Sequence, residues 1–115
     1  MKYAIPQDKL DKVVFRYLDM YYGDLENTKG EVVDIVFKKS NLDSEYGIMG
    51  WRKPDILFIH NKLVNEISGV FSTNEVDSKK VIGRWIDDRY QIEVNNTVVP
   101  IQFKFSGLRI DTKLN

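Results

Sequence analysis

The hydrophobic residues near the N-terminus recur at the period of an α-helix. Pro6 fits the first helical position, where its missing N–H needs no partner, and Gly23 is a suitable residue to end on. Three apolar residues fall off the predicted buried stripe: Phe15, Met20 and Tyr22. Either a wide apolar surface packs on the protein's own sheet, which is the commoner case, or its second side meets a partner. The stripe itself consists of Leu10, Val13, Val14, Tyr17, Leu18 and Tyr21.

Three short strands are predicted after this helix. Residues 24–30 have the composition of a loop, and the alternation over 32–37 is typical of a half-buried strand. Turn residues at 40–44 lead to a second strand over 46–51, and a third follows over 56–60. The third strand is almost entirely apolar, so we expect it to be central and buried on both faces. Together the three would form an antiparallel meander.

The C-terminal half is predicted to hold two helices and a β-hairpin. Asn61 can cap the first helix and Asp77 the second, and apolar residues recur at helical spacing up to Phe71 and Tyr90 respectively. The hairpin strands would be 91–94 and 98–105 around a turn at 95–97, with Pro100 placing the last strand at an edge. The predicted fold is a single α+β domain over residues 1–115, with 108–115 as a loose tail.

Composition excludes several kinds of chemistry. The chain has no cysteine, so it has no disulfide framework, no thiolate metal site and no cysteine nucleophile. Its 17 basic and 17 acidic residues balance and are spread evenly. The longest uncharged stretch, residues 94–103, is about half as long as a membrane-spanning helix requires. Because the N-terminus also lacks the apolar core of a signal peptide, we expect a complete cytoplasmic protein with no membrane partner.

A catalytic set is not evident from the residue types. His60 is the single histidine, and at a strand end beside a helix cap we expect it to make a structural hydrogen bond. Asp87 and Asp88 are helix neighbours that diverge by about 100°, so they do not converge on a metal ion, and Arg84 is expected to pair with Asp88 instead. We therefore predict no catalytic, cofactor-binding or metal-binding residues. An enzyme with acidic catalytic residues stays open as a third possibility, without positive evidence.

The leading hypothesis is a non-catalytic protein that acts through protein–protein interaction or self-association. The missing catalytic set, the balanced charge and the surplus of apolar and aromatic residues favour it. Its contacts would lie on the off-stripe side of the first helix, at Phe15 and Tyr22, or along the edge of the last strand. Trp51 is a further candidate, because an aromatic residue beside Arg52 and Lys53 can anchor a partner.

The alternative is a winged helix-turn-helix DNA-binding protein. Two consecutive helices followed by a hairpin have that element order, and Lys79, Lys80 and Arg84 lie near the start of the second helix, where bases would be contacted. Trp51, Arg52 and Lys53 would form a second patch. Against this alternative, the connection at 72–76 is longer than the usual tight turn and the hairpin tip is uncharged. Several aspartates on the second helix, Asp77, Asp87 and Asp88, would also repel phosphates.

Three segments carry a resemblance to a viral protein group. They are residues 1–12 (MKYAIPQDKLDK), 46–51 (YGIMGW) and 82–89 (IGRWIDDR). With these segments the chain resembles small uncharacterised proteins of tailed bacteriophages. The resemblance implies expression inside an infected bacterium, and it implies no activity, cofactor or site residues.

Overall fold

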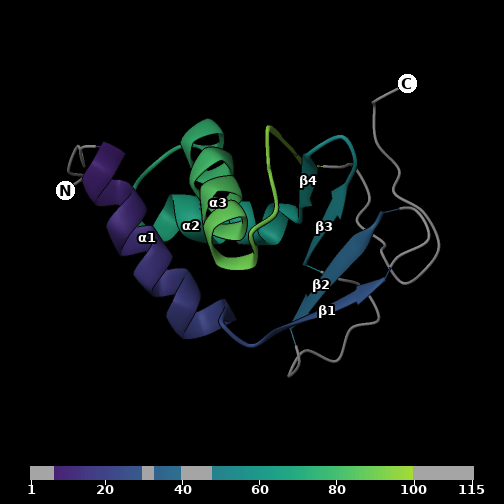
Figure 1. Cartoon of the computed structure of the whole chain (residues 1–115). Coiled ribbons are helices and arrows are strands. Elements are labelled where there is room, and N and C mark those ends of the chain that lie inside the picture. Colours follow the sequence, from purple (N-terminus) through teal and green to yellow (C-terminus); the bar gives the residue numbers. More distant parts are fainter. Residues whose placement is uncertain (1–6, 30–32, 40–47, 100–115) are drawn as a thin grey trace.

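The computed structural model describes residues 7–29, 33–39 and 48–99 of the chain. These residues form one α+β domain, in which three helices lie on one side of a five-stranded sheet (Figure 1). The predicted α+β class is therefore confirmed. In chain order the elements are α1 (Gln7–Tyr22), β1 (Leu25–Lys29), β2 (Ile35–Lys39), β3 (Met49–Arg52), β4 (Ile56–Ile59), α2 (Asn61–Val70), α3 (Glu75–Tyr90) and β5 (Asn96–Val98).

The strands follow the order β1-β2-β3-β4-β5 across the sheet. Neighbours from β1 to β4 are antiparallel, whereas β5 runs parallel to β4. The predicted three-stranded meander is confirmed as β2, β3 and β4. Two of its strands begin later than predicted, at Ile35 and Met49. Residues 30–32 and 40–47, on which parts of the predicted strands and turn fall, lie outside the described residues.

The loop predicted at 24–30 is wrong, because Leu25–Lys29 form strand β1 beside β2. Leu25 is buried and the other four residues of the strand are exposed. A strand that is exposed on both faces shows no apolar alternation, so its sequence looks like that of a loop. Pairing with β2, from Leu25 opposite Lys39 to Lys29 opposite Ile35, holds it extended.

The predicted C-terminal hairpin is also wrong within the described residues. No strand forms over 91–95, and Asn96–Val98, most of which was assigned to the turn, is strand β5. The N–H groups of residues 95 and 96 donate to the carbonyl of Asp55, which holds this segment beside β4. The chain has passed through α2 and α3 before it returns to the sheet, and such a crossover delivers a parallel strand. The rest of the predicted hairpin, from residue 100 on, lies outside the described residues.

Alternate residues of the strands face opposite sides of the sheet. Phe37, Met49 and Ile59 lie in register across β2, β3 and β4 and belong to the core beneath the helices. Val36 and Phe58 occupy the opposite face and are buried as well. β4 is thus an interior strand buried on both faces, as its apolar sequence predicts, although β3 and not β4 is the middle strand of the five.

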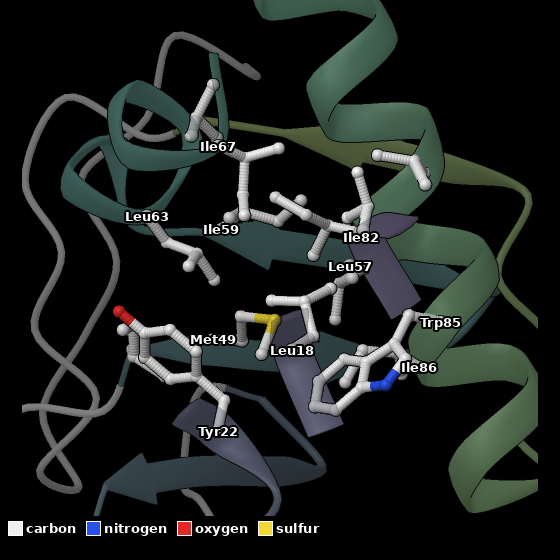
Figure 2. Close-up of a cluster of buried hydrophobic side chains, with 14 of the residues drawn as sticks. Leu18, Tyr22, Met49, Leu57, Ile59, Leu63, Ile67, Ile82, Trp85 and Ile86 are labelled. Carbon is white, nitrogen blue, oxygen red and sulfur yellow. The ribbon is translucent and has the colours of Figure 1, made fainter. Parts of the chain in front are cut away.

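The main core fills the space between the sheet and the helices (Figure 2). Every helix contributes to it, so the core holds all three against the sheet. Among the labelled side chains are Leu18 and Tyr22 of α1, Leu63 and Ile67 of α2, Ile82, Trp85 and Ile86 of α3, and Met49, Leu57 and Ile59 of the sheet.

The buried side of α1 differs from the predicted stripe. Its buried residues are spaced four apart: Leu10, Val14, Leu18 and Tyr22. Val13 and Tyr21, which the pattern assigned to the stripe, are exposed, and Tyr22, assigned outside it, is only 8% exposed. Residues spaced four apart are each rotated slightly further around the helix axis. A predicted stripe that runs parallel to the axis therefore places residues at its margins on the wrong side.

The second and third helices begin at caps other than those predicted. The N-cap of α2 is His60, whose Nδ1 accepts a hydrogen bond from the Lys62 N–H at 3.0 Å. The N-cap of α3 is Asn74, whose Oδ1 accepts from the Asp77 N–H at 2.8 Å. Because α3 starts at Glu75, the connection from α2 is residues 71–74, shorter than expected.

Candidate functional site

Hydrogen-bonded ion pairs join α1 to α3. The Asp11 carboxylate accepts two hydrogen bonds from Arg84, at 2.7 and 2.8 Å, in a bidentate arrangement. Two turns further along α1, Asp19 accepts from the Trp85 indole at 2.9 Å and from Arg89 at 3.1 Å. The carboxylates whose positions are described on α1 therefore both face α3 and are paired.

A carboxylate joins α1 to α2. Glu66 of α2 accepts hydrogen bonds from the hydroxyls of Tyr17, at 2.5 Å, and Tyr22, at 2.7 Å. Burial, together with the hydrogen bond to Glu66 and its negative charge, raises the pKa of Tyr17 to about 12. The same causes raise the pKa of Tyr22 well above its ordinary value. Figure 2 shows the Tyr22 ring among the core side chains, so its hydroxyl meets Glu66 at the margin of the core.

The side of α1 turned away from the core carries cations and exposed apolar groups. We define the outer face of α1 as Lys9, Lys12, Val13, Arg16 and Met20, which share one side because they are spaced three or four residues apart. Met20 is 68% exposed and Val13 is 40% exposed, and the three cations are exposed too. None of the three forms an ion pair with a described residue.

Aromatic side chains flank the outer face on the side of α2. The rings of Tyr17 and Tyr21 lie 4.6 Å apart between centroids, and the Tyr17 ring meets the Phe71 ring edge-on at 5.5 Å. Tyr21 is 51% exposed, and so, to a similar degree, is Val70 beside Phe71. Isolated exposed apolar residues are ordinary on a protein surface, whereas a grouped set next to uncompensated cations is typical of a contact surface.

The residues predicted to bind a partner are less accessible than expected. Tyr22 belongs to the core, and Phe15 is half-buried against it. Trp51 is also half-buried, and its Nε1–H donates to the Glu93 carbonyl at 2.9 Å. Met20, which the helical pattern placed off the stripe beside them, is the exposed member of that group. The exposure of Val13 and Tyr21 could not be predicted from the sequence, because helical spacing assigns both residues to the buried stripe.

The residues of the DNA-binding alternative are only partly brought together. Lys80 and Arg84 line a pocket of about 180 Å³ with Val94, Asn95 and Thr97. Arg84 is paired with Asp11, so the predicted surface pair with Asp88 is wrong. In the described residues the hairpin expected as the wing is replaced by β5, whereas the short 71–74 connection removes one objection to the alternative.

The other cationic candidates of that alternative do not line this pocket. Lys79 is half-buried on α3, adjacent in the chain to Lys80. Arg52 lies over the Phe58 ring, 5.2 Å from its centroid, on the side of the sheet opposite the main core. Lys53 is exposed, and its backbone N–H donates to Asp34 at 2.9 Å. Arg52 thus ends β3 and Lys53 follows it, and neither lines the pocket.

His60 has the structural role expected of it. Its ring caps α2, and burial, assisted by the nearby Lys62 charge, lowers its pKa. Among the described residues no three histidine or acidic side chains gather as metal ligands would. Within the same ranges, no helix has the length and apolar character needed to cross a membrane.

Comparison of the chain with protein-family models, with curated proteins and with solved structures gave no significant match.

Proposed function

We propose that this protein is a non-catalytic binding protein that acts through protein–protein interaction, with the outer face of α1 as its contact surface. The observation that carries the proposal is the exposure of Val13 and Met20 between cations that have no described counter-charge. Burying exposed apolar side chains is the general driving force of protein association. Most of the inner side of α1 is occupied by the core and by the two helix contacts, so the outer face is the side left for a partner.

The structural arrangement supports a contact surface rather than a catalytic centre. Among the described residues, the titratable groups with shifted pKa values are Tyr17, Tyr22 and His60, and all three make contacts that hold helices in place. A binding surface needs only a stable scaffold and an exposed face, and α1 provides that face along its length. The resemblance to small uncharacterised phage proteins implies expression in an infected bacterium, so bacterial lysate is the natural source for the test.

The proposal is tested by capture from nuclease-treated bacterial lysate with tagged variants. Val13→Thr/Met20→Gln removes the exposed apolar groups, and since both side chains are exposed, the fold should be retained. Val76→Thr is the matched control, because Val76 is an exposed valine on α3, away from this face. We expect proteins identified by mass spectrometry to be captured equally by the wild type and Val76→Thr, and about tenfold less by the double variant.

Two outcomes would contradict the proposal. Equal capture by all three proteins would show that the outer face is not the contact surface. Capture that is seen only in a parallel arm without nuclease, and that depends on Lys79, Lys80 and Arg84, would establish the DNA-binding alternative. Light scattering of the purified wild type and double variant separates self-association from binding to another protein, since only self-association changes the mass of the isolated chain.

A further inference from the structure

The charged side chains described on α1 are sorted by side, although the chain as a whole is neutral. Asp11 and Asp19 face α3 and are neutralised there by Arg84 and Arg89. Lys9, Lys12 and Arg16 face away, are exposed, and have no ion pair with a described residue. The described acidic side chains of the helix are therefore paired with α3, whereas its basic side chains are not paired with a described residue. This arrangement gives the outer face a positive potential, although the net charge of the chain is zero.

Apolar groups lie among these cations. Val13 is one turn after Lys9, and Met20 is one turn after Arg16, so cationic and apolar side chains share the same ridge. A nucleic-acid backbone would pair with three cations only weakly and would bury Val13 and Met20 against charged phosphate. A lipid surface would require larger apolar residues along the ridge to insert below the headgroups. A protein segment that alternates carboxylates with apolar side chains satisfies both kinds of group.

From this juxtaposition we propose that the outer face of α1 binds an acidic amphipathic segment of another protein, with Asp or Glu opposite Lys9, Lys12 and Arg16. The inference rests on the proposed function and specifies the chemistry of its partner. Its apolar residues would pack on Val13 and Met20, while its carboxylates would supply the counter-charges and speed the encounter. A partner with basic residues at those positions would be repelled.

The test begins with photo-crosslinking, which identifies the partner segment itself. Tyr21→p-benzoylphenylalanine replaces the exposed aromatic ring of Tyr21 with a photo-crosslinking aromatic ring beside the outer face. The protein is irradiated in nuclease-treated bacterial lysate, with and without Val13→Thr/Met20→Gln. We expect an adduct that depends on Val13 and Met20, and whose crosslinked peptide has more Asp and Glu than Lys and Arg, with apolar residues at helical spacing.

A synthetic peptide of the crosslinked sequence then measures the charge contribution. We expect Lys9→Gln/Lys12→Gln/Arg16→Gln to bind it about tenfold more weakly than the wild type. The control, Lys53→Gln/Lys62→Gln/Lys80→Gln, removes the same charge from exposed positions elsewhere and should bind like the wild type. A fluorescent DNA duplex and phosphatidylglycerol vesicles serve as the polyanion arms, and neither should show binding that depends on Met20.

Each contrary outcome has its own meaning. A neutral or basic peptide that binds both charge variants equally overturns the acidic-partner inference and leaves the proposed function standing. An adduct of the chain with itself overturns the inference in favour of self-association. Binding to the duplex or the vesicles that requires Met20 overturns it in favour of a polyanion. The absence of any adduct dependent on Val13 and Met20 overturns the proposed function and the inference together.

Discussion

The contacts that α1 makes with its two helical neighbours differ in chemistry. Toward α3 it uses ion pairs between fully charged groups, Asp11 with Arg84 and Asp19 with Arg89. Toward α2 it uses hydrogen bonds from neutral phenols to one carboxylate, Glu66. Each side chain in the two ion pairs is more than a quarter exposed to solvent, whereas Tyr22 is buried. The contact with more formal charge is therefore the more strongly screened by solvent.

Formal charge alone therefore does not determine which of these contacts contributes more to stability. An exposed ion pair contributes roughly 0.2–1 kcal/mol, because water competes for both partners and salt screens them. Hydrogen bonds to a charged acceptor contribute roughly 1.5–3 kcal/mol where water is partly excluded. We therefore expect the phenol–carboxylate contact to contribute more to the attachment of α1 than either ion pair does.

The largest effect is expected at Glu66. Glu66→Ala leaves the hydroxyls of Tyr17 and Tyr22 without their acceptor and should lower the free energy of unfolding by about 2 kcal/mol. Asn65→Ala, at the adjacent exposed position of α2, is the control and should change it by less than about 0.5 kcal/mol. Urea denaturation measures both. An equal small loss in the two variants would show that the α2 contact contributes nothing special.

The second prediction concerns alkaline pH. The pKa of Tyr17 is about 12 in the folded protein against 10 in the unfolded chain, so the folded state holds its proton more tightly. This contribution is complete below about pH 10 and is lost as the pH rises toward about 12. Ultraviolet titration should show late phenolate formation that Tyr17→Phe removes in part. Glu66→Gln should bring that titration to lower pH, and an unchanged curve in Glu66→Gln would contradict the assigned cause.

A smaller effect is expected from the contact with α3. In a double-mutant cycle of Asp11→Ala and Arg84→Ala, the coupling should be about 0.5 kcal/mol at low salt. It should approach zero near 1 M NaCl, because screening acts over only about 3 Å there. The Glu66→Ala loss should change little over the same range of salt. A coupling above about 2 kcal/mol that resists salt would reverse the proposed ranking of the two contacts.

The smallest effect concerns the start of α2, on which the Glu66 contact depends. The folded state lowers the pKa of His60, so the unfolded chain binds the proton more readily and acidification below about pH 6.5 favours unfolding. Protonation also removes the Nδ1 acceptor used by Lys62. His60→Asn keeps a cap that does not titrate, so urea denaturation at mildly acidic pH should show a smaller loss than in the wild type. Equal losses in the two proteins would mean that the cap is not the acid-sensitive element.

The sequence predicts well wherever apolar periodicity and burial coincide. The helices, the meander and the doubly buried β4 follow from local patterns that tertiary structure preserves. The sequence does not predict β1, because a strand that is exposed on both faces has no alternation of apolar and polar residues. It does not predict β5, because the pairing of that strand depends on a crossover that brings it beside Asp55. The same limit applies to the site. Met20 could be found from its place off the stripe, but the sorting of charge on α1 could not, since Arg84 pairs with Asp11 across 73 positions of sequence rather than with its neighbour Asp88.

We propose that α1 is held by its inner contacts and that its outer face binds a protein. The decisive measurement is quantitative capture from nuclease-treated lysate by the wild type, Val13→Thr/Met20→Gln and Val76→Thr. We expect the wild type and Val76→Thr to capture the same proteins, and the double variant to capture about tenfold less of them, with all three equally stable. Undiminished capture by a folded double variant would contradict it.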